Sequence, residues 1–147
     1  MNITLCGSIA FYPQMLETKS GLEALGHVVD LPPSEVPDEN GQMIPVAEYY
    51  AQRKAAAADD EYIWELKAKA IHWHFEKVAW ADAILVTNVP KNGIDGYVGA
   101  NTLMEMGVAF YLGKKIFLLN AIPEMSCTEE IRGMMPTVIG GALEKIS

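Results

Sequence analysis

The segment from Ala81 to Gly107 constrains the fold of this 147-residue chain more than any other part of the sequence. It opens with a short apolar run, Ala83 to Val86, reaches polar Asn88, and continues into a loop that holds three glycines. Asn101 then begins a stretch with helical character. A strand, a glycine loop and a helix start, in that order, build a small-molecule site at the carboxyl edge of a parallel sheet.

Strand and helix patterns alternate along the rest of the chain. Short apolar runs predict strands at residues 2–6, 27–31, 83–88, 116–119 and 137–139. Helical spacing predicts helices over 11–25, 46–80, 101–112 and 128–135, with a break near 55–60 and a loop over 32–45. This alternation predicts an α/β fold, flavodoxin-like or Rossmann-like: a doubly wound parallel sheet of about five strands with helices on both faces. We expect residues 1–147 to form a single domain.

The chain is acidic, with a formal net charge of −8 and 11 scattered basic residues. Binding to a nucleic-acid duplex needs clustered Lys and Arg, so we expect no nucleic-acid partner. The two cysteines, Cys6 and Cys127, make no disulfide framework, and Cys6 fits a buried position in a strand. No basic leader or long apolar segment is evident, so we expect a cytoplasmic protein with no membrane partner.

Residues that face a ligand are expected just after the strands. Gly7 allows close backbone approach, and Ser8 offers a hydroxyl beside free amides that suit an anion or a sugar. The alternative for Ser8 is a helix cap in a tight turn. The dinucleotide fingerprint GxGxxG and the phosphate-binding P-loop are both absent, which disfavours NAD and ATP, and we expect no cofactor. The further binding candidates are Asn88, Lys91, Gly99 and Asn101.

Glu105 is the candidate catalytic residue. It is the only acid between Asn101 and Gly113, and it stands between Met104 and Met106. Unpartnered carboxylates are rarely buried, so contact with a ligand is favoured over a role limited to the helix dipole. We expect Glu105 in the first turn of its helix, where the helix N-terminus would keep it ionised, as a nucleophile requires.

His74 shares an apolar helix face with Ile71 and Val78. A lone histidine on such a face is more often a hydrogen-bonded core residue than a catalyst. His72 and His74 point to different faces of a helix and make a poor pair of metal ligands. We therefore expect no metal site.

Several motifs, in the same order along the chain, resemble the nucleoside 2-deoxyribosyltransferase superfamily, which also contains the 2′-deoxynucleoside 5′-monophosphate N-glycosidases. They are the CGSI turn at 6–9, the ADAILV strand at 81–86, the glycine loop and the MEMG helix start at 104–107. The resemblance extends from Met1 to about Asn120 and implies a compact doubly wound fold whose subunits pair to complete each site. The aromatic-rich stretch 46–80 also predicts a subunit interface, so we expect a homodimer or higher homo-oligomer.

The resemblance identifies Glu105 with the nucleophile of that superfamily. It implies a double displacement, in which Glu105 attacks C1′ of the deoxyribose while the base leaves with a proton. A second base or water then removes the sugar from the enzyme. Gly7 and Ser8 carry over as residues that bind the sugar or its 5′ end. His74 falls where family members often carry an aspartate that holds or protonates the base, and a histidine can also donate a proton.

The chain departs from the superfamily at two further places. Gly99 stands where the transferases often carry an aspartate. No cation follows the GSI turn as in the nucleotide hydrolases, so a 5′-phosphate would depend on Ser8, Lys91 and backbone amides.

The sequence therefore predicts an enzyme that transfers or hydrolyses the N-glycosidic bond of a (deoxy)nucleoside or nucleotide, with this small molecule as its partner. An alternative is a catalytically inactive nucleotide-binding module or sensor, which the replaced aspartates favour. A flavodoxin-like flavin carrier is allowed by the fold class alone. It is the least favoured alternative, because the loop after the first strand lacks a hydroxyl-rich run.

Overall fold

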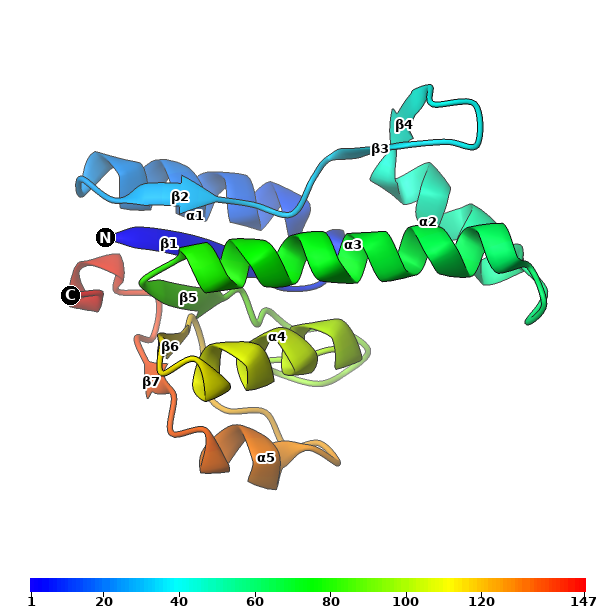
Figure 1. Ribbon diagram of the computed structural model, residues 1–147. Helices are drawn as coiled ribbons and strands as arrows, with labels where there is room; N and C mark the ends of the chain where they lie inside the picture. Colours follow the sequence, from blue (N-terminus) through cyan, green and yellow to red (C-terminus); the bar gives the residue numbers. More distant parts are fainter.

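A five-stranded parallel sheet forms the centre of the computed structural model, which describes residues 1–147 (Figure 1). Its strands lie in the order β2-β1-β5-β6-β7, and every neighbouring pair is parallel. Their bounds are β1 Asn2–Cys6, β2 Val28–Asp30, β5 Ala83–Val86, β6 Lys115–Leu118 and β7 Thr137–Val138. The predicted α/β fold with a parallel sheet is confirmed.

The predicted helices are also present, including the break in the long helical stretch. The break ends at Asp60, whose side chain accepts a hydrogen bond from the amide of Ile63 and so caps the start of the second helix. No helix of the chain combines the length and the apolar character needed to cross a bilayer. The bounds are α1 Tyr12–Ala24, α2 Val46–Ala55, α3 Glu61–Trp80, α4 Ala100–Tyr111 and α5 Thr128–Gly133, with 3-10 turns at Ile9–Phe11 and Leu143–Lys145.

Helices cover both faces of the sheet. Alternate strand residues face opposite sides, so Leu5 packs with Met15 of α1 on one face. On the other face, Val86 packs with Met106 of α4 and Ile131 of α5. Helix α3 covers the same face as α4 (Figure 1). The expected doubly wound arrangement therefore holds.

Residues 32–45, expected to be a loop, contain a small antiparallel hairpin. Its strands are β3 Glu35–Pro37 and β4 Met43–Pro45. The carboxylate of Asp38 accepts hydrogen bonds of 2.8 Å from two amides inside the turn, which is how aspartate commonly closes a turn. The hairpin packs on Tyr49 of α2, and the two stand together at the end of α3 remote from the chain termini (Figure 1).

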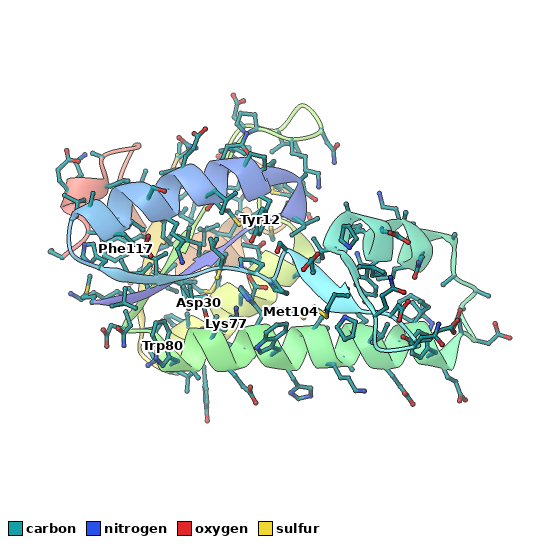
Figure 2. All side chains as sticks on the ribbon, turned by 90° about the horizontal axis from the view of Figure 1, so that it is seen from above. Tyr12, Asp30, Lys77, Trp80, Met104 and Phe117 are labelled. Carbon is teal, nitrogen blue, oxygen red and sulfur yellow. The ribbon has the colours of Figure 1, made fainter.

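Helix α3 is fixed across the sheet by hydrogen bonds at its C-terminal half. Lys77 donates to Asp30 at 3.1 Å and to the carbonyl of Leu31 at 2.6 Å, and Figure 2 shows the side chains of Lys77 and Asp30 adjacent. The N-terminal half of α3 then extends beyond the carboxyl ends of the strands toward α2 (Figure 1).

The sheet reverses its winding between β1 and β5. From β1 the chain returns through α1 to β2 on one side, whereas β5 continues to β6 and β7 on the other. Open α/β sheets bind ligands at this switch point, beside the carboxyl ends of the diverging strands. Gly7 and Ser8 leave β1 at this place.

Candidate functional site

A cavity of about 450 Å³ lies at the switch point, within the usual size range of small-molecule sites. The β1 turn, α2, α3, α4 and the hairpin all contribute to its lining, and Met104, which lines it, is labelled in Figure 2. Seven of the eight predicted site residues line it: Gly7, Ser8, His74, Lys91, Gly99, Asn101 and Glu105. A second hollow beside the glycine loop, of about 580 Å³, contains none of the predicted residues.

Asn88 is the predicted binding residue that does not line the cavity. It is fully buried, and its amide group donates to the carbonyl of Ala121 at 3.0 Å, while its side-chain oxygen accepts from the amide of Asn120 at 2.8 Å. Asn120 returns a bond to the Asn88 carbonyl at 3.1 Å. Asn88 therefore joins the ends of β5 and β6, and the binding role expected for it gives way to a structural one.

Ser8, in the turn after β1, both caps the following 3-10 turn and lies beside the cavity, so both alternatives considered for it hold in part. The hydroxyl of Ser8 accepts from the amide of Ala10 at 3.4 Å, as a cap does, and also from Lys91 at 2.8 Å beside the cavity. A side chain at Gly7 would bring a Cβ within 2.7 Å of Met15 and 3.2 Å of the Thr87 carbonyl. A larger residue at this position would displace the terminal methyl of Met15 and crowd the Thr87 carbonyl, so the close approach favours glycine.

Glu105 and His74 meet at the base of the cavity. The Nε2 atom of His74 lies 3.5 Å from Oε2 of Glu105, and the two residues are only 7% and 9% exposed. Neither ring nitrogen of His74 has a hydrogen-bond partner within the protein, and neither has Oε2 of Glu105. Buried polar atoms are normally satisfied, so this group of unpaired atoms favours contact with a bound molecule.

Burial sets the protonation state of Glu105, contrary to the expectation from sequence. Helix α4 begins at Ala100, so Glu105 lies in its second turn rather than its first, away from the free amides of the helix end. Desolvation raises the pKa of Glu105 to about 8, against smaller opposing effects of a hydrogen bond from Cys6 and the charge of Lys67. The expected ionisation by the helix N-terminus is wrong, and Glu105 holds a proton at neutral pH.

Burial has the opposite consequence for His74. Desolvation and the nearby positive charge of Lys77 lower the pKa of His74 to about 4, although Asp30 acts in the other direction. Between about pH 4 and pH 8 the pair of Glu105 and His74 therefore holds one proton, and this proton resides mainly on Glu105.

Three cations line the cavity of this acidic protein, and Lys91 is the one predicted from the sequence. Arg53 of α2 stacks 3.9 Å above the ring of Tyr50, and Lys67 of α3 donates to Asn101 at 2.9 Å. Desolvation and the charge of Arg53 lower the pKa of Lys67 to about 8. The only acid in the lining is Glu105, so the cavity is electropositive at neutral pH.

Tyr49 is a further polar residue of the cavity that the sequence does not predict. Its hydroxyl oxygen is buried without a hydrogen-bond partner. The spacing of Lys67, Ile71 and His74 along α3 places all three on one helix face, which is the one sequence signal for Lys67. The contribution of α2 depends on how the hairpin folds, which no local pattern indicates.

The chain is therefore an α/β protein with an electropositive cavity at the topological switch point of its sheet. The sequence matches no protein-family model and no curated protein. Among solved structures, a 2-deoxyribosyltransferase from Bacillus psychrosaccharolyticus aligns at 18% identity and a TM-score of 0.50. The alignment covers 80% of this chain and 71% of the transferase chain. The fold implied by the resemblance of the motifs is therefore confirmed.

Two further structures align at lower scores. A CMP N-glycosidase from Clostridium botulinum has a TM-score of 0.48 at 19% identity, with 94% of this chain and 85% of that chain covered. A conserved protein from Enterococcus faecalis V583 has a TM-score of 0.46 at 20% identity, with 82% and 64% covered.

Proposed function

We propose that this chain is an N-glycosidase or N-glycosyltransferase of the nucleoside 2-deoxyribosyltransferase superfamily, acting on a (deoxy)nucleoside or nucleotide. The observation that carries the proposal is the buried pair of Glu105 and His74, which faces a cavity at the carboxyl edge of the sheet. A covalent displacement at an anomeric carbon needs a nucleophile and a proton donor, and a carboxyl group beside an imidazole can supply both.

A single proton links the two residues in the proposed reaction. When substrate binds, the proton of Glu105 moves to His74, which creates a carboxylate nucleophile and an imidazolium acid together. The carboxylate attacks C1′ and forms an ester while the bond from C1′ to the base nitrogen breaks, and His74 donates its proton to the departing base. Water then hydrolyses the ester, or an incoming base takes the sugar. With water as the acceptor, Glu105 regains a proton, so the cycle balances.

The cations of the cavity favour a substrate that carries a phosphate. Arg53 and Lys67 flank one region of the cavity, and Lys91 stands beside Ser8 at another. An anion neutralises positive charges that are held close together and partly desolvated. We therefore favour a nucleoside 5′-monophosphate over the free nucleoside.

The change of Arg53 or Lys67 to methionine tests the phosphate preference. Loss of one charge-assisted hydrogen bond, worth about 1.5–3 kcal/mol, is expected to lower kcat/KM for 5′-monophosphates by about 10- to 100-fold. The value for the matching nucleosides is expected to change little. Lys69→Met and Lys54→Met are the matched controls, because both lysines are exposed neighbours outside the lining. Equal losses for nucleotide and nucleoside would contradict a phosphate contact.

An inactive nucleotide-binding module is the second candidate, favoured by the absence of the usual aspartates at His74 and Gly99. A screen of deoxynucleosides and their 5′-monophosphates for free base, separated by chromatography, distinguishes the two. An enzyme releases base or exchanges it for another. A binding module shows ligand-dependent thermal stabilisation without turnover.

We also propose that the chain assembles into a homo-oligomer through α3. Tyr49 and Ile63, two apolar residues of the stretch 46–80, are buried within the subunit. Trp73 and Trp80, seven residues apart on one face of α3, remain 46% and 45% exposed. Exposed tryptophans on one helix face are typical of an interface.

Sedimentation equilibrium is expected to give a multiple of the 16.1 kDa chain mass at micromolar concentration. Trp73→Glu is expected to shift the population toward the monomer, because a buried charge without a partner disfavours association. Trp64, which is 42% exposed but lies on a different side of α3, supplies the matched control Trp64→Glu. A wild-type chain that sediments as a monomer would contradict the proposal.

A further inference from the structure

Cys6 adds a third side chain that can bind a metal to the pair of Glu105 and His74 at the bottom of the cavity. It ends β1 and faces the α3 and α4 side of the sheet, where it is fully buried. One ligand atom each from Cys6, His74 and Glu105 lie within 4.8 Å of one another. The proposed glycosidic reaction uses the other two residues and gives the thiol no part beyond its hydrogen bond to Glu105.

The three groups come from three different elements, and three of their polar atoms have no hydrogen-bond partner. Both nitrogens of His74 and Oε2 of Glu105 are buried and unpaired, and Glu105 is nine-tenths buried. The 3.5 Å separation between Nε2 and Oε2 is close to the spacing of two ligands on tetrahedral zinc, about 3.4 Å for metal bonds of about 2.0–2.1 Å. The sulfur belongs to the same group, because one ligand atom of each residue lies within 4.8 Å of the other two, and zinc binding would draw the three closer together.

We propose that Cys6, His74 and Glu105 bind one Zn²⁺ ion at the base of the cavity, and that the bound ion inhibits the enzyme. Thiolate, imidazole and carboxylate are the three ligand types that zinc takes in proteins, and the ion has no redox requirement. A thiolate and a carboxylate also balance the two charges of the ion, which a buried site requires. The fourth position faces the cavity, because His74 and Glu105 line it.

Inhibition follows from the shared residues. A carboxylate bound to zinc shares its negative charge with the metal and is a poor nucleophile toward C1′, and an imidazole bound through Nε2 does not carry the proton for the leaving nucleobase. Zinc binding itself is independent of the proposed function, whereas inhibition depends on it. The sequence pattern of His72 and His74 predicts no metal site, and Cys6 is brought to His74 and Glu105 only by the tertiary fold.

Zinc binding is tested on metal-free chain by competition with a chromophoric chelator, using Zn²⁺ alone as the probe. We expect one ion per chain and at least about a tenfold loss of affinity in Cys6→Ser, since loss of even an outer-shell partner commonly costs about 10- to 100-fold. Cys127→Ser is the matched control, because Cys127 is the other cysteine and lies outside the cavity lining. Cys6→Ala gives the same comparison if the serine variant fails to fold.

Cobalt supplies a spectroscopic readout that does not depend on activity. Co²⁺ in the wild-type chain is expected to show a thiolate-to-metal charge-transfer band that Cys6→Ser lacks and Cys127→Ser retains. Absence of stoichiometric zinc binding, or binding that Cys6→Ser leaves unchanged, would overturn the site.

The inhibition is tested separately, by base release in zinc-buffered solution. The zinc concentration for half-inhibition is expected to rise at least about tenfold in Cys6→Ser, measured against that variant's own zinc-free rate. Zinc bound at the site without loss of rate would overturn inhibition alone. A chain that releases no base even without zinc would refute the proposed function and leave the metal site standing on its binding data.

Discussion

Glu105→Gln is expected to abolish base release, with kcat falling by at least about 10⁴-fold, as when other catalytic nucleophiles are removed. Glutamine keeps the volume of the side chain in the buried position between Met104 and Met106, but it neither attacks C1′ nor holds the shared proton. Chromatography of free base under single-turnover conditions measures the loss. Wild-type activity in this variant would remove the proposed mechanism.

Two measurements separate a chemical defect from a folding defect. Glu76→Gln on the exposed side of α3 is the matched control and is expected to keep full activity. Glu105→Gln is also expected to keep its binding of a 5′-monophosphate, because the cations of the cavity are unchanged. This binding is measured as the rise in melting temperature that the ligand causes.

The free energy of unfolding of Glu105→Gln tests whether the carboxyl group of Glu105 is buried. The pKa of Glu105 is raised from 4.5 to about 8 in the folded chain, so the folded state binds the proton more tightly than the unfolded state. The free energy of unfolding that this group contributes is therefore present below pH 4.5 and is lost as the pH rises through 8. Glutamine does not titrate, so Glu105→Gln should gain stability relative to wild type between these values, by at most about 1.4 kcal/mol per pH unit.

His74→Gln is expected to lower kcat by about 10²- to 10⁴-fold, the range for loss of a general acid. It should also change the shape of the pH profile. In the wild type, activity on a deoxynucleoside is expected to be level between about pH 5 and 7 and to fall above about pH 8, where the pair loses its one proton. In His74→Gln, Glu105 must release its proton to solvent, so the residual activity should rise with pH toward about 8.

The controls for this prediction are on the same helix. His72→Gln changes an exposed histidine two residues away and is expected to leave both rate and profile unchanged. Because the pKa of Lys67 is also lowered to about 8, the alkaline fall is measured in Lys67→Met as well, where it should persist. A deoxyribosyl donor whose leaving group needs no proton should restore rate to His74→Gln but not to Glu105→Gln. A wild-type profile that rises through pH 8 would contradict the shared proton.

The order of elements was accessible from the sequence because each rests on local chemistry. Apolar runs such as residues 83–86 have the length and composition of buried strands, and the helix from Ala100 has a strong apolar face. The hairpin at 35–45 was missed because each strand is only three residues long and contains proline. Its pairing depends on the turn formed by Asp38 and on packing against Tyr49.

The site residues divide in the same way. Glu105 could be predicted because burying an acid within an apolar helix costs free energy, so an acid that is kept there indicates a function. Gly7 and Ser8 could be predicted because they directly follow a strand. Asn88 follows a strand as well, yet its amide is used to join two strand ends. A position after a strand therefore indicates where a side chain lies but not which group it meets.

The linear order of residues determined the α/β class and the one acid on which the proposed chemistry depends, since both follow from periodicity and the cost of burying charge. Only the tertiary structure decided how that acid ionises and what surrounds it. Glu105 lies among Cys6, His74 and Lys67, which are separated from it by 99, 31 and 38 positions in the sequence. Burial of Glu105 raises its pKa against the smaller opposing effects of Cys6 and Lys67, and exclusion of solvent is a property of the folded chain alone.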